Sequence, residues 1–136
     1  MPALTITQAA GRDLGLIRAV ADGRAVSIGP DLLARVQQRC TEARQALRDG
    51  RLVYGVNTGM GALAGVRLTE HQQLSHQRNL LLARATGGPP WLSEAEVRAI
   101  ITVRLLTFLS GDAAVSAGLC QRLPCRPGGP RARYRG

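Results

Sequence analysis

The sequence contains no lysine and very few aromatic residues. All 18 basic side chains are arginine, against 9 acidic ones, which gives a net charge of +9. Phe, Trp and Tyr together make up 3% of the 136 residues, so Leu, Val, Ile and Ala must form the core, which suits packed helices better than a sheet sandwich. A nucleic-acid-binding protein usually mixes Lys with Arg and clusters them, whereas these arginines are spread along the chain. The charge therefore indicates compositional bias and solvated helix faces rather than a nucleic-acid partner.

Paired cysteines and long apolar runs are absent as well. The three cysteines form no Cys-x-x-Cys pair and the two histidines complete no zinc pattern, so we expect no metal site, reduced thiols and a cytoplasmic protein. No basic stretch followed by an apolar run opens the chain, so we expect no signal peptide. The longest apolar run, near residues 99–109, is interrupted by Arg104, which makes it too short and too charged to span a membrane.

The chain divides by composition into residues 1–123 and residues 124–136. The last 13 residues hold three Pro, three Gly and four Arg, which cannot bury an apolar face, so we expect a disordered basic tail. Arg, Pro, Gly and Ala are also what a GC-rich gene encodes when it is read out of frame. A frameshift or misassigned end is our preferred explanation of residues 124–136, and a genuine basic tail is the alternative.

Helical periodicity runs through residues 1–123. Pro30 at a first turn opens an apolar stripe with helical spacing. Thr69 and Ser93 each precede a Gln or Glu by three positions, which is the pattern of a capping box. The sequence predicts an all-α, mainly helical fold, with at most one short strand pair near residues 25–28 and 53–56. The predicted helices cover residues 5–21, 30–48, 69–86, 94–110 and 112–123.

The most unusual local sequence is Tyr54-Gly55-Val56-Asn57-Thr58-Gly59-Met60-Gly61. Its three glycines allow positive φ angles and a close approach of the backbone to a ligand. We expect Tyr54 to be exposed on such a loop, where a phenol beside a positive field can take a proton. Asn57 could bind a carboxylate or orient the loop. The alternative is a structural turn. The glycine spacing does not fit a dinucleotide fingerprint, and no Lys follows as a P-loop requires.

The loop resembles the signature of the histidine, phenylalanine and tyrosine ammonia-lyases, Tyr-Gly-x-Asn-Thr-Gly-Phe-Gly, with Met60 in place of Phe. The resemblance covers about residues 3–123 and is strongest to the N-terminal part of the histidine enzymes. Two further stretches resemble motifs of the family: Gln77-x-Asn79-Leu80, and Val97-Arg98 with Arg104 ahead of Gly111.

The resemblance implies a function. These enzymes remove ammonia from an aromatic amino acid without an external cofactor, by means of a methylidene-imidazolone ring that forms from an Ala-Ser-Gly tripeptide of the same chain. It implies that Tyr54 is a catalytic base or acid, and that Asn57, Thr58, Gly59 and Gly61 shape the loop or bind substrate. It also implies the N-terminal part of a helical-bundle fold, a small amino acid as substrate, and a homotetramer whose active sites combine several subunits.

Two features depart from the family. No Ala-Ser-Gly occurs in the 136 residues, so we expect this chain alone to be inactive. The pair that often reads Ser-His in the histidine enzymes corresponds to Ala83-Arg84 here, and an arginine stays charged and cannot mimic a neutral imidazole. Arg84 is either a substrate contact or a solvated residue near a helix end. Histidine remains the default substrate, while a phenylalanine or tyrosine ammonia-lyase and an aminomutase remain open.

Three hypotheses follow from these departures. The chain is a truncated or frameshifted ammonia-lyase without activity of its own, or a lyase fragment completed by another chain that carries the ring, or a small basic binding module that has kept part of the fold. The reading frames downstream of codon 123 separate the first hypothesis from the others. A strongly salt-dependent affinity for nucleic acid would favour the third.

Overall fold

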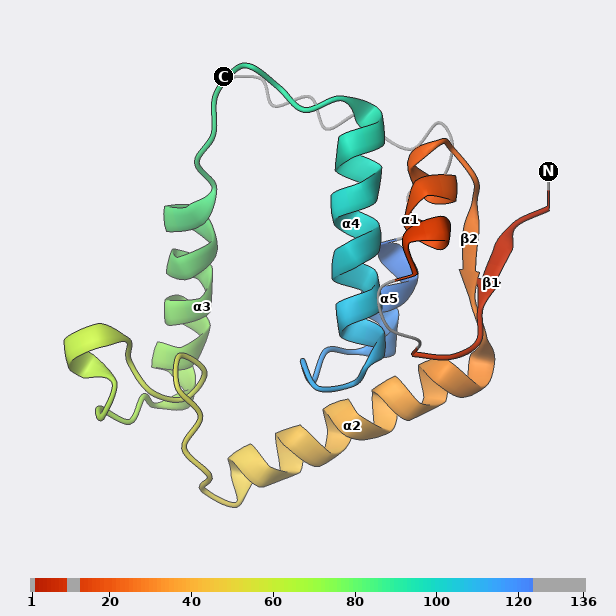
Figure 1. Cartoon of the computed structure of the whole chain (residues 1–136). Coiled ribbons are helices and arrows are strands. Elements are labelled where there is room, and N and C mark those ends of the chain that lie inside the picture. Colours follow the sequence, from red (N-terminus) through yellow and green to blue (C-terminus); the bar gives the residue numbers. More distant parts are fainter. Residues whose placement is uncertain (1, 10–12, 124–136) are drawn as a thin grey trace. The chain divides into compact units, whose positions relative to one another are not determined.

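The computed structural model of the chain describes residues 2–9 and 13–123 (Figure 1). The predicted disorder of residues 124–136 and the part of the predicted helix 5–21 that falls on residues 10–12 lie outside this range. The chain separates into two compact units: Met1–Glu42 together with Leu92–Gly136, which we call unit 1, and Ala43–Trp91, which we call unit 2. Each unit is described by itself below.

The fold is mainly helical, as the sequence predicts. The helices are α1 (Leu14–Ala21), α2 (Pro30–Arg48), α3 (Glu70–Arg84), α4 (Glu94–Leu109) and α5 (Ala117–Arg122), with a short 3-10 helix η1 (Gly61–Leu63) and two strands, β1 (Leu4–Ile6) and β2 (Val26–Ile28). No helix in the described part of the chain is long and apolar enough to cross a membrane.

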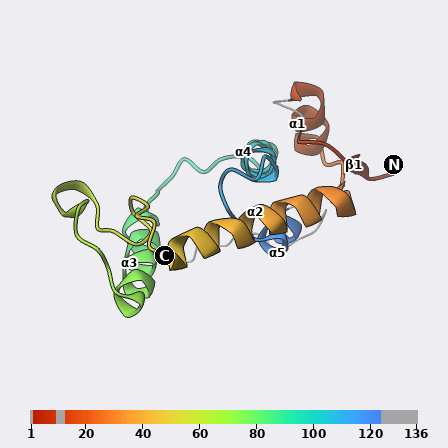
Figure 2. The ribbon, with the colours of Figure 1, turned by 90° about the horizontal axis from the view of Figure 1, so that it is seen from below.

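Unit 1 is built around α4. Helix α1 packs along α4, and Figures 1 and 2 show the two side by side. The core consists of one residue of β1, the apolar stripe of the first half of α2, the last turns of α4, and one residue of α5. These side chains meet away from water. The buried members of the core are Ile6, Leu32, Val36, Leu105, Leu109 and Cys120.

The strand predicted near residues 25–28 is confirmed as β2, but the start of the first helix and the predicted partner of this strand were wrong. Residues 4–6 are not helical but form β1, which pairs in parallel with β2, Leu4 opposite Val26. The helix begins only at Leu14, because the Asp13 side chain accepts a hydrogen bond from the Leu16 backbone N–H at 3.0 Å and caps it. The predicted partner strand at residues 53–56 is a turn instead, in which Gly55 has a φ of 69°.

The predicted helix over residues 112–123 is shorter than expected. Gly111 and Ala114 have φ angles of 88° and 52°, so the backbone leaves the helical region there and α4 cannot continue. Helix α5 starts after Ser116, whose side chain accepts a hydrogen bond from the Leu119 N–H. The predicted boundaries of the other three helices agree with the structure to within two residues at each end.

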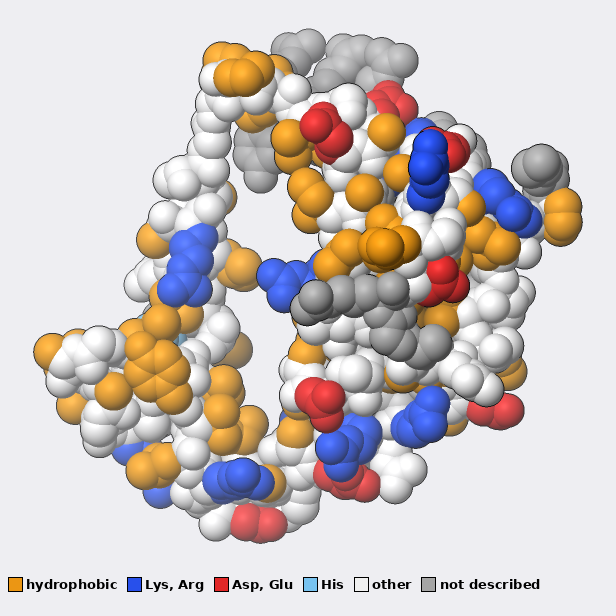
Figure 3. All heavy atoms as spheres, in the orientation of Figure 1, with side chains coloured by type: hydrophobic (Ala, Val, Ile, Leu, Met, Phe, Trp, Pro, Cys, Tyr) orange, Lys and Arg blue, Asp and Glu red, His pale blue; other side chains and the backbone are white. Residues whose placement is uncertain are grey.

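Unit 2 holds the last turns of α2, a long loop, η1 and α3. Helix α3 begins at the predicted capping box, in which Thr69 and Gln72 bond each other's backbone N–H groups at 3.3 and 2.8 Å. None of the 15 residues of α3, all of which the structure describes, is fully buried. Apolar side chains also remain on the surface around the loop before α3, as Figure 3 shows. Unit 2 therefore presents its loop and helix faces to the surroundings.

Candidate functional site

The loop that carries Tyr54 closes on itself within unit 2. An isolated antiparallel bridge joins Thr58 to Arg67. Beside it, the Gly59 N–H donates to the Val66 carbonyl at 3.0 Å and the Leu68 N–H donates to the Asn57 carbonyl at 2.8 Å. The segment between these bonds folds back through η1. The loop is thus a defined structure, not an open excursion of the chain.

Asn57 lies inside this loop. Its side chain is 3% exposed, and both ends of its amide are bonded to loop backbone. Its Oδ1 accepts from the Val53 N–H at 2.8 Å, and its Nδ2 donates to the Arg51 carbonyl at 2.7 Å. The amide therefore ties residues 51–53 to the turn that follows, which is the loop-orienting role of the two that the sequence suggested.

Thr58 and Gly59 are buried beside Asn57. The Thr58 hydroxyl accepts from the Gly55 N–H at 3.2 Å and donates to the Gly59 carbonyl at 3.0 Å. A Cβ placed on Gly59 would lie 2.6 Å from the Leu63 carbonyl oxygen and 2.7 Å from the Leu63 Cβ. Because real Cβ atoms essentially never approach so closely, only glycine fits at this position without a shift of the backbone.

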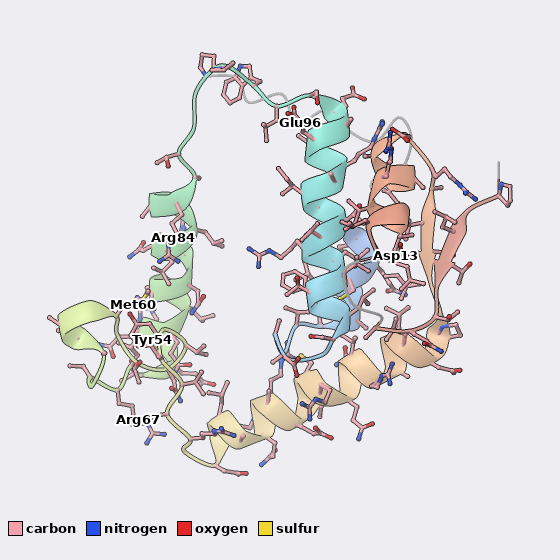
Figure 4. The ribbon with its side chains drawn as sticks, in the orientation of Figure 1. Asp13, Tyr54, Met60, Arg67, Arg84 and Glu96 are labelled. Atoms are coloured by element: carbon pink, nitrogen blue, oxygen red, sulfur yellow. The ribbon has the colours of Figure 1, made fainter. Side chains whose placement is uncertain are left out.

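Tyr54 projects from the surface of this buried framework. Its side chain is 59% exposed, and its hydroxyl oxygen accepts a hydrogen bond from the Gly61 N–H at 3.3 Å. Gly61, at a φ of 58°, takes a left-handed conformation that most other residues avoid. Figure 4 shows Tyr54 beside Met60, at the end of the loop next to α3. The phenol is thus accessible, with one N–H group directed at its oxygen.

Helix α3 contacts the loop through two glutamines to which the sequence analysis gave no role, although Gln77 opens the family-like motif Gln77-x-Asn79-Leu80. Gln77 donates from Nε2 to the Gly55 carbonyl at 2.9 Å, and Gln73 donates from Nε2 to the Leu68 carbonyl at 3.0 Å. The two residues are one helical turn apart and therefore share a face. This spacing is visible in the sequence, but their loop partners are not, because they depend on how the chain folds back.

Arg84 is the last residue of α3 and is exposed. It lies seven positions after Gln77, about two helical turns, which places both on one face of the helix. Figure 4 shows it farther along α3 than the Tyr54 loop. Among the described residues it makes no side-chain hydrogen bond or ion pair that would join it to Tyr54, so the structure does not bring these two predicted site residues together.

The charge of unit 2 is strongly positive. Residues 43–91 contain six arginines and two carboxylate side chains. A field of this sign attracts anions to the surface on which Tyr54 is exposed, and an amino acid presents a carboxylate. No group of three or more His, Cys, Asp or Glu side chains that could hold a metal ion occurs within residues 2–9 and 13–123.

The two described cysteines are not accessible for reaction. Cys40 and Cys120 are free and buried, both in unit 1. Burial raises the pKa of the Cys120 thiol above its usual range, and its backbone hydrogen bond offsets this only in part. Both described cysteines are buried, whereas the Tyr54 phenol is exposed, so the phenol is the better candidate for chemistry.

Comparison with known proteins identifies a family. Residues 13–124 match the aromatic amino acid lyase family. The histidine ammonia-lyase of Sorangium cellulosum is 41% identical over 96 residues, which are 68% of this chain and 19% of that enzyme. This chain spans about a fifth of the length of the curated relatives that it matches.

Solved structures agree with the sequence match. The ergothioneine-degrading ergothionase of Treponema denticola has a TM-score of 0.80 and 30% identity, over 90% of this chain and 24% of that one. Phenylalanine aminomutase of Pantoea agglomerans also has a TM-score of 0.80, with 25% identity over 89% of this chain and 24% of that one. Both neighbours have the helical arrangement described above. The match over residues 13–124, together with the identity to the Sorangium enzyme, shows that this chain belongs to the aromatic amino acid lyase family.

Proposed function

We propose that this chain supplies the tyrosine loop of an ammonia-lyase that acts on an aromatic amino acid, by default histidine. In this role Tyr54 takes the β-proton of the substrate. The observation that carries the proposal is the contrast within the loop: Asn57, Thr58 and Gly59 are buried and bonded to the loop backbone, while Tyr54 beside them is 59% exposed. A loop whose buried hydrogen bonds hold one phenol exposed at its surface is suited to proton transfer.

The elimination needs a base at the β-carbon. The β C–H bond breaks, its electron pair forms the new double bond, and the amine leaves as ammonia. The Tyr54 oxygen, once deprotonated, accepts the β-proton, and the Gly61 N–H at 3.3 Å stabilises negative charge on that oxygen. The arginines of unit 2 favour the approach of the substrate carboxylate.

The electrophile that makes the amine a leaving group is a separate requirement. In the family a methylidene-imidazolone ring made from Ala-Ser-Gly supplies it, with no external cofactor. The 136 residues contain no such tripeptide, and we therefore assign no step to that ring in this chain. A base alone contributes about 10²–10⁴-fold, far less than an enzyme needs, so we propose that the chain by itself is inactive.

The remaining parts of the proposal follow the family. We place the protein in the cytoplasm, with a small amino acid as its ligand and a homotetramer as its assembly. A second candidate is an aminomutase or a phenylalanine or tyrosine ammonia-lyase. The likeness to a phenylalanine aminomutase favours it, and so does Arg84, which replaces a neutral residue of the histidine enzymes by a permanent charge.

A chimera tests this proposal. Residues 13–123 replace the matching N-terminal segment of the Sorangium cellulosum enzyme, and ammonia release is measured from histidine, phenylalanine and tyrosine. We expect the chimera to release ammonia and the 136-residue chain to release none. Reversion of Ala83→Ser and Arg84→His in the chimera should raise kcat/KM for histidine relative to the other two substrates. Turnover by the 136-residue chain would contradict the proposal, and preference for phenylalanine or tyrosine would favour the second candidate.

A further inference from the structure

The loop and α3 are joined by side-chain amides at two points. Gln73 reaches the Leu68 carbonyl, which lies just before the start of the helix, so it fixes only the approach to α3. Gln77 reaches the Gly55 carbonyl, 22 positions earlier in the chain and directly after Tyr54. Of these two bonds, only that of Gln77 therefore bears on the position of the tyrosine.

We propose that Gln77 is a positioning residue for Tyr54. Its side-chain amide holds the carbonyl of Gly55 and so fixes the turn in which the Tyr54 hydroxyl meets the Gly61 N–H. The value of this arrangement for catalysis rests on the proposed role of Tyr54 as the proton acceptor. The geometric claim does not, because it concerns the loop alone.

The bonding of Gly55 explains why one amide has this effect. Gly55 has a φ of 69°. Glycine can adopt many other backbone conformations as readily as this one. Its N–H donates to the Thr58 hydroxyl at 3.2 Å, and its carbonyl accepts from Gln77 at 2.9 Å. With both sides bonded, the glycine has one orientation. Without Gln77, its carbonyl turns to water and the adjacent Tyr54 loses its fixed direction.

The Gln77 bond lies at the surface, so it adds little to global stability. A neutral hydrogen bond of this kind contributes on the order of a two- to tenfold shift in a local equilibrium. Its effect should therefore appear in the conformation of the loop and not in the unfolding of the chain. This difference separates a positioning role from a merely structural one.

The test uses Gln77→Glu in the full 136-residue chain, with Tyr134→Phe so that Tyr54 is the only tyrosine. At neutral pH the carboxylate cannot donate and repels the Gly55 carbonyl. Below about pH 4.3 the protonated carboxyl can donate again. We expect the Tyr54 ring resonances in NMR spectra to shift at neutral pH, and Gly61 amide exchange to speed up roughly two- to tenfold. Both changes should reverse as the new carboxyl is protonated.

Two further variants complete the experiment. Gln121→Glu places the same charge on an exposed residue of α5 in unit 1 and should leave the Tyr54 resonances as they are in the parent. Gln77→Ala should displace the Tyr54 resonances at every pH without reversal, and it serves if Gln77→Glu does not fold. Tyr54 and Gly61 signals in Gln77→Ala that match the parent would overturn the proposal. So would a change in Gln77→Glu that acid does not reverse. None of these readouts uses turnover, so failure of the lyase proposal would leave their outcome intact.

Discussion

Three consecutive residues of the Tyr54 loop, Asn57, Thr58 and Gly59, are each held in place by hydrogen bonds or by close packing. Asn57 offers one acceptor and one donor to two backbone groups, the Val53 N–H and the Arg51 carbonyl. Thr58 bonds the backbone on both sides of its hydroxyl, and Gly59 leaves room for Leu63. Most residues of the motif therefore determine the conformation of the loop, and Tyr54 is the residue that the loop exposes.

The lack of room for a Cβ atom at Gly59 leads to a testable prediction. Gly59→Ala forces the new methyl group against the Leu63 backbone, and we expect a loss of about 1–3 kcal/mol in the stability of the loop. Gly65→Ala is the matched control, because nothing lies within 4 Å of a Cβ at that position. Amide exchange at position 59 and at Leu68 measures both variants. Equal exchange in the two variants would contradict the close packing of Gly59 against Leu63.

A second prediction concerns the side-chain amide of Asn57. Asn57→Ala leaves the Val53 N–H and the Arg51 carbonyl without their partners in a part-buried site. We expect a cost of about 1–3 kcal/mol in the local stability of the loop and faster exchange of the Val53 amide. Gln45→Ala, which removes an exposed contact from α2 to Asp49 just after the helix, is the control and should cost much less. Protection of the Val53 amide in Asn57→Ala would refute this account of the loop.

Among the elements, the helices with local start signals were predicted well. Thr69 with Gln72 and Ser93 with Glu96 form capping boxes at the positions that the sequence indicates, because a cap depends only on residues within one turn. The strand β1 was missed, because its pairing with β2 joins residues more than 20 positions apart. The start of α5 was missed because the backbone turn at Ala114 has no glycine to mark it.

The cap of α4 should respond to acid. Hydrogen bonds from the Ser93 hydroxyl and then from its backbone N–H hold the pKa of Glu96 below its usual range. A carboxylate with a lowered folded pKa stabilises the helix start above its unfolded pKa, and this contribution is lost as the pH falls through the folded value. We expect the Ser93 amide resonance to follow this loss in an acid titration.

Glu96→Gln provides the comparison for that titration. Glutamine can still accept from the Ser93 N–H but carries no charge, so the acid response of the Ser93 amide should disappear. Glu94→Gln, which removes only the ion pair with Arg98 at 3.2 Å, should leave the response in place. An acid response that survives in Glu96→Gln would mean that another group controls the start of α4.

For the molecule as a whole, the family and the helical fold followed from the sequence, while the geometry around Tyr54 did not. Eight consecutive residues suffice to recognise the loop, because its glycines and its Asn-Thr pair are fixed by the local bonds described above. The contact from Gln77 could not be predicted, since it depends on how α3 folds back on the loop. For the same reason, the sequence could not show that Arg84 has no bond to Tyr54.

Exposed apolar side chains carry a prediction for the isolated chain. Leu74 and Leu81 on α3 are 73% and 75% exposed, and their spacing of seven positions places them on one face. Apolar patches of this kind promote association, so we expect the mass measured by light scattering to rise with concentration. Leu74→Ser with Leu81→Ser should reduce this rise, and the exposed polar pair Thr41→Ser with Gln45→Ser should not. A chain that stays monomeric at all concentrations would contradict the prediction.

The central claim is that this loop presents Tyr54 as the proton acceptor of a lyase. The most direct measurement is kcat for ammonia release from histidine by the chimera that carries residues 13–123, with and without Tyr54→Phe. We predict that Tyr54→Phe lowers kcat by about 10²–10⁴-fold, while the near-ultraviolet absorbance of the methylidene-imidazolone ring is unchanged. Full activity of the Tyr54→Phe chimera, with the ring formed, would contradict the account.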